Sequence, residues 1–184
     1  MRIVDIMRGG SSSPINLKCG DKYDSLIQVY ENDKIIYTSQ HLSTIPSRCL
    51  TIASEKIFNQ DEYPLHGVLA DDTYAGIWTN SSQLGNHFVL FQSNLFNKIS
   101  NDSQLTYEME IFNSVKNNPS MNNKMKVSQN CIHSGGYLSN FSEGCLTFYP
   151  DDFIEFQKLW KYNDKVYVNL TTMKNYQYPI LKAA

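Results

Sequence analysis

The chain of 184 residues lacks the run of about twenty apolar residues that a membrane-spanning helix needs. Its mean hydropathy of −0.40 excludes a chain buried in a membrane. It also lacks an excess of one charge, because its net charge is −2 and its pI is about 6.1, so its overall charge does not favour nucleic acid or an anionic membrane as a partner. No internal repeat, heptad pattern or phosphate-binding loop is present. The length suits a single domain over residues 1–184 with a substantial core.

The first residues lack the continuous apolar segment of a secretory signal, because charged side chains interrupt them. We therefore expect the protein to be cytoplasmic or to be exported by a route that needs no signal peptide. The segment Gly9-Gly10-Ser11-Ser12-Ser13-Pro14 is typical of a loop, so residues 1–20 are predicted to be a flexible start with at most a short strand.

Metal-ligand spacing is missing as well. The four cysteines form no Cys-x-x-Cys pair and the four histidines have no zinc-ligand spacing, so neither a metal nor a cofactor is predicted. Cys19, Cys49 and Cys131 are interpreted as small buried apolar residues. Cys145 differs from them because a glycine precedes it and a histidine lies within reach of the same loop.

The segment from Cys131 to Leu146 is the part of the sequence that carries chemistry. It reads Cys-Ile-His-Ser-Gly-Gly-Tyr-Leu-Ser-Asn-Phe-Ser-Glu-Gly-Cys-Leu, and its Gly, Ser and Asn residues favour a tight loop that folds His133 back onto Cys145. A thiol is a strong nucleophile only as thiolate, which a neighbouring imidazole stabilises near neutral pH. Gly144 permits a sharp turn whose consecutive backbone N–H groups could stabilise an oxyanion.

This segment resembles the active-site signature of the L,D-transpeptidase family, which is His-Gly, a variable loop, then Ser-His-Gly-Cys and an aliphatic residue. The resemblance covers about sixteen residues and implies a β-sandwich whose cysteine attacks a peptidoglycan stem peptide. It makes Cys145 the nucleophile, His133 the base, and Gly144 and Cys145 the donors of the oxyanion amides. Glu143 replaces the second histidine of the family, and Thr147 replaces an Arg or Asn, which predicts different substrate contacts.

The same resemblance implies further roles within the loop. Substrate binding is assigned to Ser134, Gly135, Tyr137 and Glu143, with the Glu143 carboxylate expected to point to solvent. Ser142 is counted with the catalytic residues. The group that orients His133 stays open between Ser134, Ser139, Ser142 and a backbone carbonyl.

The rest of the chain predicts a mainly β fold with one helix. Residues 26–38 are two β-rich segments around a polar turn, typical of a hairpin, and residues 86–92 are apolar on both faces, typical of a central strand. Phe153, Phe156 and Trp160 recur at helical spacing behind the acidic pair Asp151-Asp152. A helix is therefore predicted from about 151 to 162, for which that pair offers an N-cap and an acidic first turn. Residues 165–170 alternate as a closing strand.

Two other stretches have structural interpretations. Residues 94–126 are rich in Asn, Ser and Lys and are predicted to be an insertion, which the amphipathic patch at 105–112 could supply with a short helix. Asp71-Asp72 is interpreted as a turn. Of the remaining histidines, His41 and His66 are interpreted as surface residues, and only His87 could approach the active centre.

Three functions are consistent with these patterns. The first is a cysteine acyl-transfer enzyme of the L,D-transpeptidase type, with peptidoglycan or a peptide as its substrate. The second is a non-catalytic binding or structural module of the same fold, associated with a cell wall or a phage, in which the loop is only a turn. The third is a cysteine peptidase or amidase, which shares the acyl-enzyme but resolves it with water. No oligomeric state is predicted.

Overall fold

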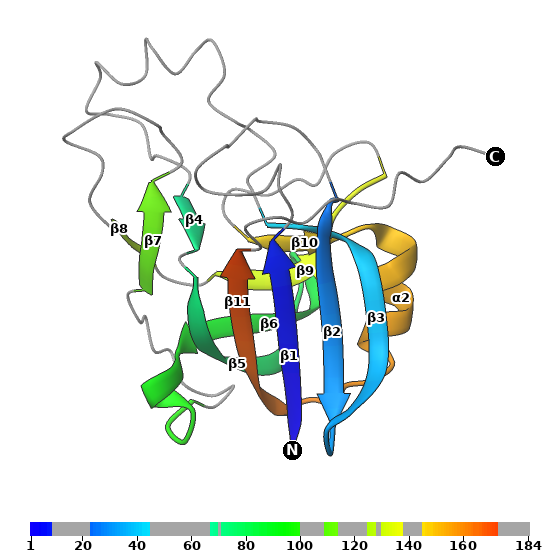
Figure 1. Ribbon diagram of the computed structural model, residues 1–184, viewed down its shortest axis with the longest axis horizontal. Helices are drawn as coiled ribbons and strands as arrows, with labels where there is room; N and C mark the ends of the chain where they lie inside the picture. The colour runs from blue at the N-terminus through cyan, green and yellow to red at the C-terminus, as the bar shows by residue number, and fades with distance from the viewer. Residues whose placement is uncertain are drawn as a thin grey trace, which may run out of the picture.

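The architecture is that of a computed structural model (Figure 1). It describes residues 1–8, 23–44, 67–69, 71–99, 109–113, 125–127, 130–137 and 145–172. Eight strands in this part of the chain form one sheet that closes on itself, in the order β1-β11-β5-β6-β9-β10-β3-β2. Their bounds are β1 Arg2–Arg8, β2 Ser25–Glu31, β3 Lys34–Ser43, β5 Asp72–Ser81, β6 Gly85–Gln92, β9 Cys131–Ser134, β10 Leu146–Phe148 and β11 Lys165–Thr172.

A second, small sheet has the order β4-β7-β8, with bounds Gly67–Leu69, Met109–Asn113 and Met125–Val127. The mainly β fold predicted from the sequence is confirmed. The predicted sandwich would have two stacked sheets, whereas eight of the strands are hydrogen-bonded in a closed order around one core. The structure therefore supports a mainly β fold with an eight-stranded closed sheet.

The predicted hairpin at 26–38 is confirmed as β2 and β3, joined by Asn32 and Asp33. Both turn residues have positive φ values, 50° and 62°. Two consecutive residues with positive φ are the signature of a type I′ turn, which matches the twist of the two strands. The predicted central strand is also confirmed, because β6 lies between β5 and β9.

The N-terminal residues are more ordered than the sequence suggested. Strand β1 pairs with β2 antiparallel and with β11 parallel, so residues 2–8 lie inside the sheet, while 9–20 lie outside the described residues. Its last residue, Arg8, is fully buried and its Nη1 lies 2.8 Å from a carboxylate oxygen of Asp71. Burial lowers the pKa of Arg8 to about 10 although Asp71 raises it, so the guanidinium stays charged at neutral pH. The carboxylate of Asp71 therefore supplies a counter-charge at a bend, whereas Asp72, which was interpreted with it as a turn, is the first residue of β5.

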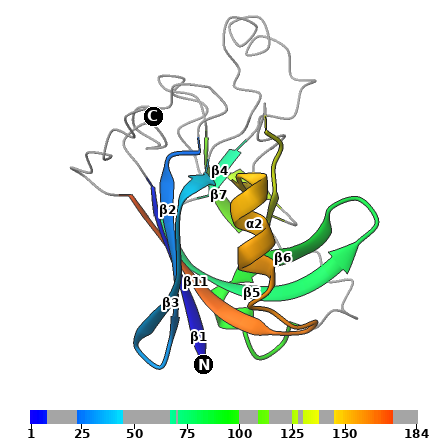
Figure 2. The same ribbon diagram turned by 90° about the vertical axis from the view of Figure 1, so that its right-hand side faces the viewer.

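The core of the barrel is aromatic where helix α2 (Pro150–Gln157) enters it. Figure 2 shows α2 between β3 and β6. The ring of Phe156 lies 4.5 Å from that of Phe148, and the ring of Phe88 lies 4.9 Å from that of Trp160 and 4.8 Å from that of Trp78, measured between centroids. Offset and edge-to-face contacts at these distances stabilise beyond burial alone. The aromatic stripe of the predicted helix thus forms part of the core.

The helix differs from its prediction at both ends. It starts at Pro150, whose fixed φ suits the first helical position, and Tyr149 is the N-cap without a side-chain bond. The Asp151-Asp152 pair lies in the first turn instead of at the cap, where its charge still favours the helix dipole. Regular α-helix stops at Gln157, and i to i−3 bonds from residues 158–160 continue the chain as a tighter turn that keeps Trp160 buried.

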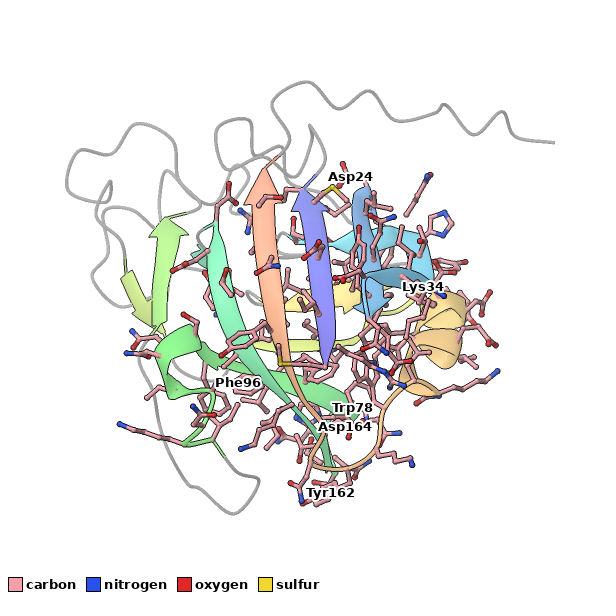
Figure 3. The ribbon with its side chains drawn as sticks, turned by 60° about the horizontal axis from the view of Figure 1, so that its bottom comes forward. Asp24, Lys34, Trp78, Phe96, Tyr162 and Asp164 are labelled. Atoms are coloured by element: carbon pink, nitrogen blue, oxygen red, sulfur yellow. The ribbon has the colours of Figure 1, made fainter. Side chains whose placement is uncertain are left out.

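Residues after α2 are tied back to the sheet. The backbone N–H of Trp78 donates to the carbonyl of Asp164 at 2.8 Å, and that of Asn163 donates to the carbonyl of Trp78 at 3.0 Å. Figure 3 shows Trp78 and Asp164 next to each other at this point. Strand β11 follows this turn. It confirms the closing strand that was predicted at 165–170.

The predicted insertion at 94–126 is partly integrated into the fold. Ile99 is buried in a second apolar cluster with Ala75, Ile77 and Phe91, and the Phe96 ring stacks on Tyr167 at 4.2 Å. Residues 109–113 form strand β7, so the helix suggested for 105–112 is wrong where the structure describes that patch. Among the described residues, none of the helices has both the length and the apolar character needed to cross a membrane.

Candidate active site

Strands β9 and β10 bring the two ends of the predicted catalytic loop together. They pair in parallel, with Leu146 opposite Ile132 and Thr147 opposite His133. Ile132 and Leu146 point into the barrel core, so the residues that alternate with them belong to the other face of the sheet. That face receives Cys131 and His133 from β9 and Cys145 from the start of β10. His133 and Cys145 are close enough to form a hydrogen bond, as the sequence predicts.

The imidazole of His133 is oriented by a backbone carbonyl. Its Nδ1 lies 2.7 Å from the carbonyl oxygen of Ser134. A carbonyl oxygen can only accept, so Nδ1 carries the proton and Nε2 is left for the thiol of Cys145. The Ser134 hydroxyl donates to the carbonyl of Gly135 instead. Of the groups left open by the sequence, the backbone carbonyl orients His133.

The electrostatics of the pair favour the charged state of both partners. Burial acts to lower the pKa of His133, but its hydrogen bond to Cys145 and the thiolate charge outweigh burial, and the pKa is raised. A hydrogen bond from Cys131, and then the hydrogen bond and charge of His133, lower the pKa of the Cys145 thiol against the effect of its burial. The site therefore holds a thiolate and an imidazolium at a pH where a free thiol is protonated.

The second thiol, Cys131, is a part of this site that the sequence interpretation missed. It is buried and forms no disulfide with another described residue, and its hydrogen bond to Cys145, its burial and the charge of Cys145 all raise its pKa. The proton therefore stays on Cys131 while Cys145 ionises. Its interpretation as a small buried residue is correct for its burial and incomplete for its role. The available signal was its place two residues before His133 on a strand, since such residues share a face.

His87 lies beside the pair on the neighbouring strand β6. Phe88 pairs with Ile132, so His87 is next to His133 in the antiparallel register. Its Nδ1 donates to the carbonyl of Gly85 at 2.9 Å, and burial, followed by the charge of His133, lowers its pKa. The neutral form is therefore the stable one. The expectation that His87 could approach the active centre is met, with a neutral imidazole.

The structure describes only some of the other residues predicted for the site. Ser142 and Gly144, which were predicted to be catalytic, and Glu143, which was predicted to bind substrate, lie outside the described residues. The backbone N–H of Gly135 donates to the carbonyl of Phe148 at 2.8 Å and so extends the pairing of β9 with β10. Ser134 is partly buried, and its hydroxyl is already bonded. Tyr137 is the member of the set that is most accessible, with 60% of its surface exposed.

Three tyrosines gather where the loop leaves β9. The rings of Tyr23 and Tyr137 both meet Tyr149 edge-on, at 5.5 Å and 5.3 Å between centroids. The hydroxyl of Tyr23 donates to the carbonyl of Gly136 at 2.7 Å, and that of Tyr137 donates to Asp151 at 2.7 Å. These contacts anchor the loop that follows His133 to the start of α2. Tyr23 and Tyr149 carried no local pattern that marked them in the sequence.

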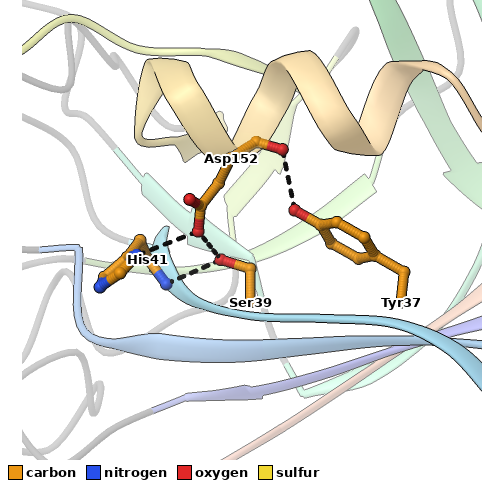
Figure 4. Close-up of polar contacts among 4 residues, drawn as sticks. All are labelled: Tyr37, Ser39, His41 and Asp152. Atoms are coloured by element: carbon orange, nitrogen blue, oxygen red, sulfur yellow. Dashed lines mark hydrogen bonds and ion pairs between the residues drawn. The ribbon is translucent and has the colours of Figure 1, made fainter.

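Another histidine, His41, lies at the same end of α2 in a group of polar contacts with Ser39 and Asp152 (Figure 4). His41 Nδ1 lies 3.0 Å from a carboxylate oxygen of Asp152, and the Ser39 hydroxyl donates to the same oxygen. A serine nucleophile would have its hydroxyl bonded to the imidazole. The hydroxyl of Ser39 is bonded to the carboxylate instead. The interpretation of His41 as a surface residue is only partly correct, because its ring is 43% exposed and also paired.

Known proteins provide no relative for this chain. Comparison with protein-family models, with curated proteins and with solved structures gives no match. The resemblance to L,D-transpeptidases therefore rests on residues 131–146 alone, and the chemistry has to be argued from the side chains.

The arrangement suits nucleophilic chemistry. No group of three or more His, Cys, Asp or Glu side chains within the described ranges is placed to hold a metal ion. What these ranges do contain is a partly exposed Cys145 thiol that is hydrogen-bonded to an oriented imidazole and to a second thiol. Such a thiolate can attack an electrophilic carbon, and the imidazolium can return a proton to the leaving group.

Proposed function

We propose that the chain is a cysteine acyl-transfer enzyme of the L,D-transpeptidase type, which acts on peptide stems of peptidoglycan through a thioester on Cys145. The observation that carries the proposal is the pairing of Cys145 with an imidazole whose Nδ1 is fixed by the Ser134 carbonyl. A turn with only a structural role needs neither an oriented imidazole nor a lowered thiol pKa. Both features are the usual requirements of cysteine acyl transfer.

In the first half of the reaction the Cys145 thiolate attacks the carbonyl carbon of the scissile amide. The carbonyl oxygen becomes an oxyanion, which the backbone N–H groups of Gly144 and Cys145 would stabilise. The His133 imidazolium then protonates the leaving amine, the C–N bond breaks, and a thioester to Cys145 remains. In the second half His133 takes a proton from an incoming amine, which attacks the thioester and releases the thiolate.

The substrate contacts are proposed to differ from those of the family. Thr147, which stands where the family has an Arg or Asn, is fully buried, and its hydroxyl has no hydrogen-bond partner among the described residues. It cannot present a charge to a substrate carboxylate. Tyr137, exposed at the exit of β9, is the described residue best placed to meet a substrate beside the catalytic pair.

The L,D-transpeptidase-like sandwich belongs to the same proposal. The mainly β fold supports it, and the parallel pairing of β9 with β10 brings Cys145 back to the level of Cys131 and His133. An experimental structure in which the strands around Cys145 separate into two facing sheets would support the family fold. Retention of a single closed order would favour an independent barrel that carries the same site.

The proposal is tested by intact mass after incubation with a carbapenem, a β-lactam that acylates the cysteine of L,D-transpeptidases generally. We expect one adduct, mapped to Cys145, under reducing conditions. Cys145→Ser is the matched control and should form no stable adduct. Absence of an adduct in the folded protein, with iodoacetamide still labelling Cys145 rapidly at pH 6.5, would contradict a transpeptidase and favour another cysteine hydrolase. Slow labelling as well would contradict the catalytic proposal altogether.

Transpeptidase and hydrolase are separated by the second half-reaction. A stem peptide supplied with an amine acceptor should yield a cross-linked product if an amine resolves the thioester. A product that is only shortened, whatever the acceptor concentration, would assign the chain to the peptidases or amidases.

A further inference from the structure

The two thiols of the site point to a covalent chemistry that acyl transfer does not use. Cys131 is neither the nucleophile nor the base, yet it is a buried thiol hydrogen-bonded to Cys145. Extending the β9–β10 register by one residue from the pair Leu146–Ile132 places Cys145 directly beside Cys131.

Neighbouring strands lie about 4.8 Å apart, which is within the range of about 4.4–6.8 Å that the Cα atoms of a disulfide span. Both side chains leave the same face of the sheet, since Ile132 and Leu146 occupy the core face. The hydrogen bond between the thiols shows that the sulfur atoms already approach each other.

We propose that Cys131 and Cys145 form a reversible disulfide when the protein meets hydrogen peroxide, so that Cys131 switches the site off and protects its nucleophile. The inference rests on the proposed function in one respect, which is that the disulfide would stop acyl transfer. Formation of the disulfide itself needs no acyl-transfer activity.

The chemistry proceeds in two balanced steps. The Cys145 thiolate attacks one oxygen of the peroxide, so that an S–O bond forms, the O–O bond breaks and hydroxide leaves; the sulfur is oxidised to a sulfenic acid and the peroxide is reduced. The Cys131 sulfur then attacks the Cys145 sulfur. The S–S bond forms, the S–O bond breaks, and the hydroxyl leaves as water with the proton of Cys131.

Exposure and acidity assign the order of the two thiols. Cys145 is partly exposed, whereas Cys131 is 5% exposed, so a dissolved oxidant meets Cys145 first. The Cys145 thiolate also raises the pKa of Cys131 by hydrogen bonding and by charge. Conversion of that thiolate to a neutral sulfenic acid removes the charge, which eases ionisation of Cys131 at the moment when it must attack.

The experiment uses the folded chain with Cys19→Ser and Cys49→Ser, so that only the two site thiols remain. After hydrogen peroxide we expect a mass lower by two hydrogens, a proteolytic fragment that links the peptides of Cys131 and Cys145, and full recovery of both thiols with dithiothreitol. Adding Cys131→Ser should abolish the linked fragment and lead to sulfinic acid on Cys145, which dithiothreitol does not reverse.

Two results would overturn the inference. One is that Cys145 gains oxygen atoms in the chain with Cys131 as fast as in the Cys131→Ser chain. The other is that the unsubstituted chain links Cys145 to Cys19 or Cys49 instead. If Cys131→Ser does not fold, the linked fragment from the chain that keeps both site thiols still decides the matter.

The outcome is separable from that of the proposed function. A disulfide without carbapenem acylation of the reduced protein means that the acyl-transfer proposal fails and the thiol switch stands. Acylation of the reduced protein that prior peroxide leaves undiminished means that the switch fails and the enzyme proposal stands. If both are correct, peroxide blocks acylation and dithiothreitol restores it.

Discussion

His133 and His41 are oriented by the same device, with Nδ1 bonded to an acceptor oxygen, and yet they lie in different environments. His133 is 5% exposed, is held by the Ser134 carbonyl and meets a thiol. His41 has a ring that is 43% exposed, is held by the Asp152 carboxylate, and has next to it a serine that is bonded to that carboxylate. An oriented imidazole is therefore not enough for nucleophilic catalysis. The nucleophile has to face its free nitrogen, away from bulk water.

The largest expected effect tests the His133 side of this comparison. His133→Ala removes the imidazolium, so the pKa of Cys145 should rise toward the ordinary value for cysteine, about 8.5. Below that pH a higher pKa means less thiolate. Alkylation of Cys145 by iodoacetamide at pH 6.5 should therefore slow by about tenfold or more. His41→Ala is the matched control and should leave the rate unchanged. Equal slowing by both variants would mean that His133 has no special relation to the thiol.

A smaller effect is expected for Cys131→Ala. Its thiol donates to Cys145 and lowers the pKa of that residue, but S–H is a weak donor and adds no charge, so the loss should be less than for His133→Ala. We expect the alkylation of Cys145 at pH 6.5 to slow by about threefold, because a slightly higher pKa leaves less thiolate at that pH. The difference from the parent chain should vanish above the ordinary thiol pKa, where Cys145 is fully ionised in both chains. A constant difference at every pH would indicate altered access instead.

The third prediction concerns the His41 side, where the effect should be on stability. Asp152→Ala removes the acceptor shared by His41 and Ser39 and so removes two contacts between the start of α2 and β3, while the bond from the Tyr37 hydroxyl to the backbone carbonyl of residue 152 remains. Because these contacts are partly exposed, we expect the free energy of unfolding in urea to fall by about 1 kcal/mol. Asp151→Ala, which loses only the exposed contact to Tyr137, should change it by less than about 0.5 kcal/mol. Alkylation of Cys145 should be unaffected by either variant.

The smallest effect is expected at His87. Its pKa is lowered, so it is neutral near pH 7 and adds no charge to the site. His87→Gln, which fills most of the space, should change the alkylation rate of Cys145 at pH 6.5 by less than about twofold. A larger decrease would show that His87 helps to hold the thiolate together with His133.

The parts of the fold that were predictable have local signals. Asn32 and Asp33 supply the turn of the hairpin, and Phe153, Phe156 and Trp160 recur at the period of a helix. Strand β1 and the closure of the barrel were not predicted, because they depend on pairing between distant segments. Nothing near Arg2–Arg8 in the sequence indicates that its partner is β11.

The candidate site shows the same division. The proximity of His133 and Cys145 follows from a short Gly-rich loop, and the structure brings them together. Cys131 was missed because its contact with Cys145 depends on the parallel register of two strands, which no spacing in the sequence reports. The orienting carbonyl of Ser134 could not be chosen either, because backbone carbonyls are available at every residue.

The parallel pairing of β1 with β11 has a consequence for synthesis of the protein. Ile3 pairs with Tyr167, so β1 is synthesised long before its partner β11, and until β11 is available β1 and β5 both lack that neighbour at one edge. Pairing across such a sequence separation closes a long loop at high entropic cost and favours folding over milliseconds to seconds. A nascent chain that ends before Lys165 exposes two sheet edges, which can pair with other chains. The protein is thus most vulnerable to aggregation before β11 emerges.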